Sequence, residues 1–284
     1  MQLTFWGVRG STPVPGPGTV RYGGNTPCIE VRGATGRIFL DAGTGLLAAA
    51  RAESAAGRPP LADTTVLISH THWDHIQGLT LHPALYRAGG VLRVMGPSQG
   101  RVPLKATIER LLAPEYFPVG PEALAGRLDV AEVTEGRFEV NGFQVDAFRV
   151  RHGVVTFGYR ILESTSGKSF IFITDNELGD GPASDLSAWR GDVVRFVRDG
   201  DLMVHDAMWR EQDWPGRRGW GHSTAAQAIG LAQEAGVRQL TLYHYDPALD
   251  DDALDAYVAR ATAAAADAGV SLAAAREGVT VTLE

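Results

Sequence analysis

Cysteine is nearly absent from this chain, since Cys28 is the only one among 284 residues. A lone cysteine cannot close an internal disulfide, which excludes the disulfide-stapled scaffold of many small secreted proteins. Long apolar runs are also missing, and a membrane-spanning helix needs about 20 apolar residues in succession. The first six residues, MQLTFW, lack the basic start and apolar stretch of a signal peptide. We therefore expect a cytoplasmic protein without a membrane partner.

Basic residues are fewer than acidic ones. The chain has 26 lysines and arginines and 33 aspartates and glutamates, which gives a net charge of −7. This balance argues against broad, non-specific binding of nucleic acid, although it leaves room for a local basic patch. The 44% apolar and 21% charged content is ordinary for a globular protein. Neither a linker nor an internal repeat interrupts the chain, so we expect one domain over residues 1–284.

Histidine, by contrast, is concentrated in one place. Three of the eight histidines stand with one aspartate in the stretch SHTHWDH, residues 69–75. The stretch follows TVLI, residues 65–68, which is typical of a short and fully buried strand. A buried strand that ends in such a cluster can hold metal-binding side chains in a fixed loop, whereas no packing requirement calls for three imidazoles there. The pattern therefore predicts a metal site.

Further nitrogen and oxygen donors occur where other predicted strands end. His152, Asp175 and His244 each follow such a strand, and strand ends are where α/β sheets assemble their sites. Together with the cluster they provide five imidazoles and two carboxylates, enough for two ions with one bridging carboxylate. Donors of this kind, without thiolate, suit Zn²⁺, with Mn²⁺ or Fe²⁺ as alternatives. Two close ions clamp the attacking and leaving oxygens of a displacement.

The order of predicted elements indicates the fold class. The chain is rich in strands as far as about residue 175 and alternates strands with helices after it. Five strands are expected between residues 128 and 173, and their short polar turns are typical of antiparallel hairpins. An amphipathic helix is expected at 101–112. Two sheets packed face to face, with helices on the outside, satisfy this pattern.

These residues resemble a known family. The run HTHWDH, residues 70–75, reproduces the HxHxDH motif of the metallo-β-lactamase superfamily, and the downstream donors follow in the order of its remaining ligands. The resemblance covers nearly the whole chain. It implies the α+β class with a four-layer αββα sandwich, and a hydrolase with two divalent metal ions. By this resemblance, one ion is held by His70, His72 and His152, the other by Asp74, His75 and His244, and Asp175 bridges them.

A second motif resembles one branch of that superfamily, the ribonuclease Z-type phosphodiesterases. The run HST, residues 222–224, resembles the branch's HST motif, and HDA, residues 205–207, resembles its HEAT motif with aspartate in place of glutamate. Ser-Thr also suits the N-cap of a helix, and a helix N-terminus favours a phosphate. The resemblance implies that His222 is a general acid oriented by Asp206, so that Asp74, Asp206 and His222 are the catalytic residues. A capped helix beside a buried aspartate is the simpler alternative.

One departure from ribonuclease Z bears on the substrate. That enzyme carries a long arm that grips tRNA between the ligands matching His152 and Asp175, whereas only the 22 residues 153–174 separate them here. The missing arm disfavours structured RNA and favours a small phosphodiester such as a cyclic nucleotide, which armless members of the branch hydrolyse. By this resemblance, a metal-bound hydroxide attacks phosphorus while His222 protonates the leaving oxygen. A homodimer is implied by the resemblance alone.

Three other functions remain open. A tRNA 3′-end endonuclease would use the same site on a larger substrate. A lactone, thioester or β-lactam hydrolase would use the same metal ions and would not require His222. A non-catalytic nucleotide binder would have no need for the complete set of ligands, which argues against it.

Other residues and segments have two interpretations each. Asp41 ends a predicted strand, where it either caps the next helix or supports a metal-binding histidine. Trp73 either floors the pocket or packs its loop, and His82, before a proline, is expected to be structural. The Gly/Pro-rich loop 9–18 either folds over the site or lies on the surface. The segment 99–126 either shapes the pocket or only packs a helix.

Overall fold

The computed structural model describes residues 1–57, 61–179 and 184–284, and its strands form two sheets of seven. The first sheet has the order β14-β1-β2-β3-β4-β5-β6 and the second β13-β12-β11-β10-β9-β8-β7. The first comprises β1 (Gln2–Gly7), β2 (Cys28–Arg32), β3 (Arg37–Leu40), β4 (Asp63–Leu67), β5 (Val91–Gly96), β6 (Arg127–Glu132) and β14 (Thr280–Thr282). The second comprises β7 (Gly136–Val140), β8 (Phe143–Val150), β9 (Thr156–Glu163), β10 (Lys168–Ile173), β11 (Leu202–Asp206), β12 (Gln239–Tyr243) and β13 (Ser271–Ala274).

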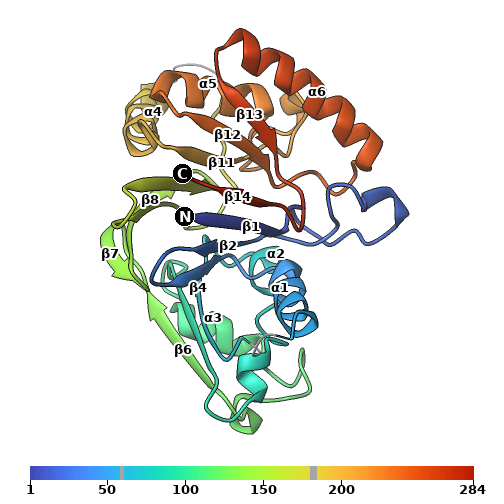
Figure 1. Ribbon diagram of the computed structural model, residues 1–284, viewed down its shortest axis with the longest axis vertical. Coiled ribbons are helices and arrows are strands. Elements are labelled where there is room, and N and C mark those ends of the chain that lie inside the picture. Colours follow the sequence, from blue (N-terminus) through green and yellow to red (C-terminus); the bar gives the residue numbers. More distant parts are fainter. Residues whose placement is uncertain (58–60, 180–183) are drawn as a thin grey trace.

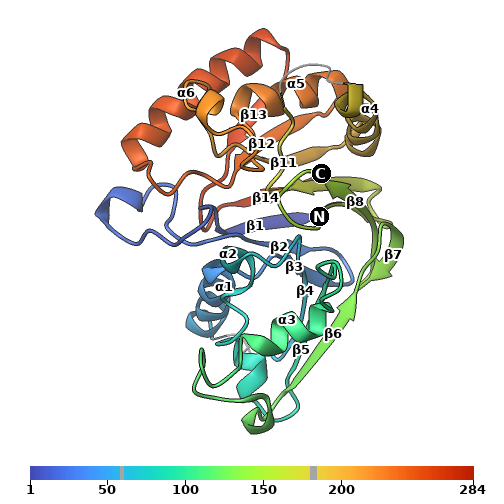
Figure 2. The same cartoon turned by 180° about the vertical axis from the view of Figure 1, so that it is seen from behind.

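Helices cover the outer face of each sheet. Figure 1 shows α4, α5 and α6 beyond the second sheet and α1, α2 and α3 beyond the first, and Figure 2 shows the same layers from behind. The α-helices are α1 (Thr44–Ala55), α2 (Trp73–Ile76), α3 (Leu104–Arg110), α4 (Ser184–Val197), α5 (Ala225–Ala235) and α6 (Asp251–Asp267). Short 3-10 turns occur at Pro17–Thr19, Pro83–Tyr86, Pro121–Ala123 and Trp214–Gly216. This arrangement confirms the predicted four-layer αββα sandwich.

The sandwich is stabilised by apolar side chains between the layers. Phe5 of the first sheet packs on Tyr243 of the second with ring centroids 6.1 Å apart, and Phe172 packs on the same tyrosine at 6.0 Å. All three rings are buried. A smaller apolar cluster, which includes Leu46 and Ile108, lies between the first sheet and its helices. None of the described helices combines the length and the apolar character that a bilayer crossing requires.

One strand prediction was wrong in its pairing. The strand expected near residue 128 is β6, and it pairs in parallel with β5 at the edge of the first sheet instead of forming a hairpin. The chain then passes to the second sheet, where β7 to β10 form the expected antiparallel ladder. Alternation along a strand shows which face is buried but does not identify the partner. The helix expected at 101–112 is the shorter α3, which begins after Pro103.

The topology brings several strand ends to one edge of the sandwich. Strands β10, β11 and β12 run parallel, so their carboxyl ends lie side by side. The end of β4 meets that edge from the first sheet, because Ser69 O accepts a hydrogen bond from Phe157 N at 2.9 Å and Ile68 O accepts one from the Tyr159 hydroxyl at 2.7 Å. The loops that follow these strands therefore face one another.

Arg9, just after β1, ties the N-terminal loop to the segment that leads into α6. Its side chain is fully buried. Nε donates to the carbonyl of Gly23 at 2.8 Å, and Nη1 donates to those of Leu249 and, at 3.4 Å, Asp246. The carboxylate of Asp251 lies 3.7 Å from Nη2. A buried charge held by so many partners is costly to remove, because the partners stay behind without a donor.

We therefore expect Arg9→Met to lower the free energy of unfolding by about 3 kcal/mol, measured by urea denaturation. Arg21→Met is the matched control, because Arg21 pairs with Asp252 and Asp255 of the same helix at the surface, where an ion pair contributes little. The control should unfold at nearly the wild-type urea concentration. Equal losses in the two variants would contradict this role of Arg9.

Candidate metal centre

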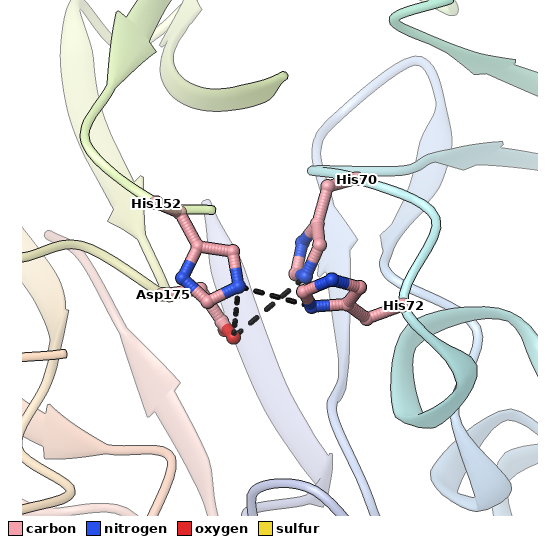
Figure 3. Close-up of side chains that lie close together, drawn as sticks. All are labelled: His70, His72, His152 and Asp175. Carbon is pink, nitrogen blue, oxygen red and sulfur yellow. Dashed lines mark hydrogen bonds and ion pairs between the residues drawn. The ribbon is translucent and has the colours of Figure 1, made fainter. Parts of the chain in front are cut away.

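The seven side chains expected to bind metal converge where the two sheets meet. His70 and His72 come from the segment that joins β4 to α2, and Asp74 and His75 lie in α2 itself. His152 follows β8, and Asp175 and His244 follow β10 and β12. Figure 3 shows His70 and His72 pointing across the gap toward His152 and Asp175. Two groups that share no residue have their donor atoms within 4.8 Å of one another: His70, His72, His152 and Asp175; Asp74, His75 and His244. A third group, Asp175, His222 and His244, overlaps with both.

Asp175 lies between the two groups and turns one oxygen toward each. Its Oδ2 is 3.7 Å from Nε2 of His70 and 3.6 Å from Nε2 of His152. Its Oδ1 is 3.2 Å from Nε2 of His75 and 3.1 Å from Nε2 of His244. A carboxylate placed in this way can serve one cation on each side.

The second group is closed by Asp74. Its Oδ2 lies 3.2 Å from Nε2 of His75 and 3.3 Å from Nε2 of His244. The same oxygen accepts a hydrogen bond of 2.7 Å from the backbone amide of Ser11. Loop 9–18 therefore reaches the site through its backbone, and Gly10 lies so close to His244 that a Cβ there would come within 2.5 Å of the ring.

The unpaired donors fit a metal ion. The Nε2 atom of His70 is buried and has no hydrogen-bond partner, and that of His75 faces only the carboxylates of Asp74 and Asp175. A buried polar atom without a partner is costly, so native sites supply one. Clustered imidazole and carboxylate donors, with no thiolate among them, suit a divalent cation.

Asp41 lies next to His75, one of the expected metal ligands. Its Oδ2 lies 2.7 Å from Nδ1 of His75, and its Oδ1 accepts a hydrogen bond from the amide of Ser69 at 2.7 Å. The following helix, α1, has Gly43 at its N-cap and receives no side-chain cap. Asp41 therefore orients a histidine, and it does not cap the helix. Such a carboxylate fixes the tautomer of its histidine and leaves Nε2 free for a metal ion.

The imidazoles and carboxylates also shift one another's titration. Burial alone would raise the pKa of Asp175, but His244, His75 and His70 around it lower that pKa well below its usual range. Burial lowers the pKa of His75, yet Asp74, Asp175 and Asp41 together raise it well above its ordinary value. Asp74 and Asp175 therefore stay ionised, which suits the binding of a cation.

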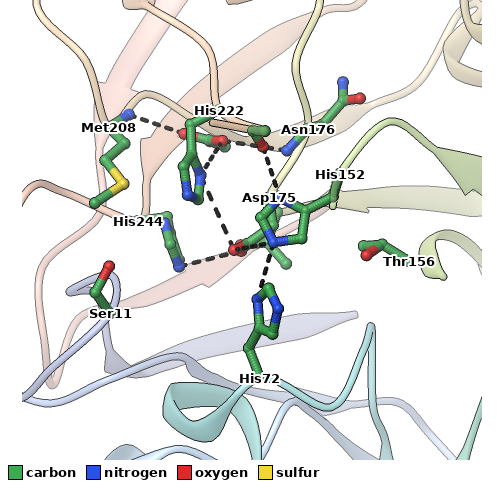
Figure 4. A network of polar contacts seen from close by, with 12 residues as sticks. Ser11, His72, His152, Thr156, Asp175, Asn176, Met208, His222 and His244 are labelled. Carbon is green, nitrogen blue, oxygen red and sulfur yellow. Dashed lines mark hydrogen bonds and ion pairs between the residues drawn. The ribbon is translucent and has the colours of Figure 1, made fainter. Parts of the chain in front are cut away.

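His222 stands beside the seven side chains and is held by Asp206. Its Nδ1 lies 2.9 Å from Oδ2 of Asp206, and its ring stacks on that of His244 at 5.2 Å. Figure 4 shows it next to His152, His244 and Asp175. Burial lowers the pKa of His222, but Asp206 more than compensates and raises it to about 9. Asp206 itself accepts hydrogen bonds from the amides of Asn176, Met208 and Ser223.

Comparisons with known proteins agree with this geometry. The family model described as a beta-lactamase superfamily domain matches residues 36–245. The chain belongs to the metallo-β-lactamase superfamily. Ribonuclease Z of Archaeoglobus fulgidus is 26% identical, with 89% of each chain covered. The solved structure of unliganded yeast PDE1 matches with a TM-score of 0.69 at 15% identity over 99% of both chains. The solved structure of the short form of human tRNase Z matches with a TM-score of 0.66 at 17% identity over the whole of both chains.

The expectation of a metal-dependent hydrolase of the ribonuclease Z-like phosphodiesterase branch is thus confirmed. The arm between His152 and Asp175 is absent, because β9, β10 and the turn that joins them account for the segment. Divalent metal ions are implied by the superfamily and by the clustered donors together. In Figure 3, His70 and His72 from the first half of the chain face His152 and Asp175 from the second half.

The structure corrects one expectation about phosphate binding. The first amides of α5 are not available to a phosphate, because each donates to an acceptor within the protein. Thr224 is the N-cap and forms a capping box with Gln227. The acceptors of the amides of Ser223, Thr224, Ala225, Ala226 and Gln227 are, in order, Asp206, Gln227, Tyr257, Glu211 and Thr224.

Other expected residues lie apart from the centre or at its rim. Trp73 is 57% exposed. His82 is buried and caps the turn that begins at Pro83. Loop 9–18 lies over a cavity of about 360 Å³ lined in part by Pro13, Asn25 and Glu277, and not by Trp73. In the segment 99–126, Tyr116 is exposed and α3 packs on the first sheet.

Three of the predicted site residues have a backbone conformation that the sequence does not reveal. Asp41, Asp175 and His244 have φ values of 58°, 43° and 57°. This is the left-handed backbone conformation, which residues other than glycine rarely adopt. Strain of this kind collects at functional sites and is maintained by the surrounding structure. Glu177 is also newly identified, because its carboxylate accepts hydrogen bonds from the amides of Gly219 and Gly221.

A substitution at Gly221 tests whether its contact with His152 is needed for metal binding. Its carbonyl lies 2.9 Å from Nδ1 of His152, its φ is 82°, and a Cβ there would lie 2.1 Å from the same ring nitrogen. We expect Gly221→Ala to weaken zinc binding at least tenfold, because it displaces His152, as judged by competition with a chelator.

Gly219→Ala is its matched control. Gly219 has nearly the same φ, 81°, but nothing lies within 4 Å of the position that a Cβ would take, so this variant carries the backbone strain without the clash. It should bind zinc as the wild type does. If both variants lose the metal equally, the contact with His152 is not what matters.

Proposed function

We propose that this protein is a phosphodiesterase with two metal ions that hydrolyses a small phosphodiester, such as a cyclic nucleotide. The observation that carries the proposal is the His222–Asp206 pair beside the convergent donors. The alternative, a lactone, thioester or β-lactam hydrolase, would not require His222, whereas a phosphodiester with a poor leaving group needs an acid at the leaving oxygen.

In this proposal each ion has its own set of ligands. The allocation follows the two groups of donors, with one oxygen of Asp175 facing each group. Zn²⁺ suits the donors best, and Mn²⁺ or Fe²⁺ are the alternatives. The ligands are His70, His72 and His152 for the first ion, Asp74, His75 and His244 for the second, and Asp175 for both.

The chain's own residues supply the remaining chemistry. When bound, the ions supply Lewis acidity and bring the pKa of a coordinated water toward neutrality. Because Nδ1 of His222 is engaged by Asp206, Nε2 is the nitrogen that donates a proton to the leaving oxygen. Asp206 keeps the ring protonated and oriented, and three backbone amides hold Asp206 in turn. The amides of α5 contribute nothing to the phosphate, since they are already bonded.

Cleavage of the 3′ end of tRNA is the second possibility, because the ribonuclease Z of Archaeoglobus fulgidus is similar over 89% of this chain. The short connection from β9 to β10 and the net charge of −7 argue against it. Zinc-loaded protein should hydrolyse bis(p-nitrophenyl) phosphate and at least one cyclic nucleotide, and should leave precursor tRNA uncut. Failure on all small phosphodiesters would refute the proposal, and efficient tRNA cleavage would favour the second possibility.

The dependence on the leaving group tests the role of His222. We expect His222→Ala to lower kcat by about 10²- to 10⁴-fold on a cyclic nucleotide, whose alkoxide leaving group needs a proton. The loss on bis(p-nitrophenyl) phosphate should be much smaller, because p-nitrophenolate leaves without one. Asp206→Asn should show the same pattern to a smaller degree.

Metal content serves as the control for these variants. Both should retain the wild-type zinc content, since neither residue belongs to the proposed ligand set. An equal loss on the two substrates with zinc retained would contradict the acid role. Full activity on the cyclic nucleotide would do so as well.

A further inference from the structure

The loop between β11 and α5 has a small apolar core of its own. Met208, Trp209 and Trp214 are buried and form an apolar cluster apart from the two main cores. The loop is closed at its base, because Trp209 N donates to the carbonyl of Ser223 at 3.1 Å. An element with this much internal packing can hold a surface side chain in a fixed place.

A stack of side chains runs outward through this loop from the proposed acid. The ring of Trp209 meets the ring of His222 edge to face at 5.8 Å. The guanidinium of Arg217 lies over Trp209 at 4.9 Å and over Trp220 at 4.5 Å. Among the described residues, no carboxylate forms an ion pair with Arg217. The guanidinium is therefore held by the two indole rings, and it covers one face of Trp220.

The outer member of the stack, Trp220, is exposed. Its side chain has 56% of its surface in contact with solvent, which is unusual for the largest apolar residue. The next residue, Gly221, contacts His152 through its carbonyl. Centroid distances of 6.0 Å from Trp220 to Trp209 and 5.8 Å from there to His222 place the Trp220 ring no more than 11.8 Å from that of His222.

We propose that Trp220, backed by Arg217, is the platform on which the aromatic base of a nucleotide substrate stacks while its phosphate lies at the metal centre. The proposal rests on the proposed function and narrows its substrate class to phosphodiesters that carry a base. An exposed indole supported from behind suits this task, because base stacking is tolerant of sequence and needs only a flat, rigid ring.

Direct binding tests the platform without requiring turnover. AMP and ribose 5-phosphate share a sugar and a phosphate and differ by the base. Calorimetry with zinc-loaded protein should show AMP binding about tenfold or more tighter than ribose 5-phosphate, as expected for one stacked base. Trp220→Ala should abolish this difference and leave the affinity for ribose 5-phosphate unchanged. Trp220→Phe should restore most of it, since a phenyl ring also stacks.

Trp73→Ala is the matched control, because Trp73 is 57% exposed and adjoins a proposed ligand, His72, from the first half of the chain. It should leave the preference for AMP unchanged. The proposal is overturned if wild-type protein shows no preference or no measurable binding of AMP at millimolar concentration. It is also overturned if Trp220→Ala weakens both ligands equally, or if Trp73→Ala abolishes the preference instead.

These results are separable from those on the proposed function. Zinc-loaded protein that prefers AMP through Trp220 but hydrolyses no phosphodiester would refute the function and leave the platform in place. Protein that hydrolyses phosphodiesters with equal affinity for AMP and ribose 5-phosphate would refute the platform alone.

Discussion

The carboxylate of Asp175 is the constraint on which the rest of the site depends. It is fully buried, it faces four imidazoles, and its backbone is held in the left-handed region at the end of β10. Such a group is tolerable only where it is paired or binds a metal ion. The two sheets supply the four imidazoles from opposite sides, so the site depends on the fold that brings the sheets together. His222 and Asp206 lie one strand further along the same edge.

Much of this arrangement could be predicted from the sequence. The run HTHWDH after a buried strand, with donors at three later strand ends, resembles the metallo-β-lactamase superfamily, and that resemblance implied the four-layer fold and the hydrolase class, all of which are confirmed. These predictions succeeded because ligand spacing and strand hydrophobicity are local patterns. The absent arm was also predictable, since it depends only on the count of residues between His152 and Asp175. The identity of the ligands stays a prediction, as do the cytoplasmic location, the single domain and the homodimer.

Other features were not predictable, for physical reasons that differ. The pairing of β6 with β5 depends on tertiary contacts that strand alternation does not encode. The backbone amide of Ser11 that reaches Asp74 has no side-chain signature. The helix N-terminus at Thr224 led us to expect a phosphate site. Its amides instead donate hydrogen bonds to side chains from distant segments. The tryptophans were visible in the sequence, but which one stands beside the proposed acid was decided by the folding of the loop after β11.

Anomalous diffraction at the zinc edge, from crystals of the zinc-loaded protein, would locate the ions. The shared role of Asp175 predicts two peaks, one on each side of its carboxylate. The first should lie among His70, His72 and His152, and the second among Asp74, His75 and His244. One peak at full zinc loading, or two peaks of which either lies out of contact with Asp175, would contradict it.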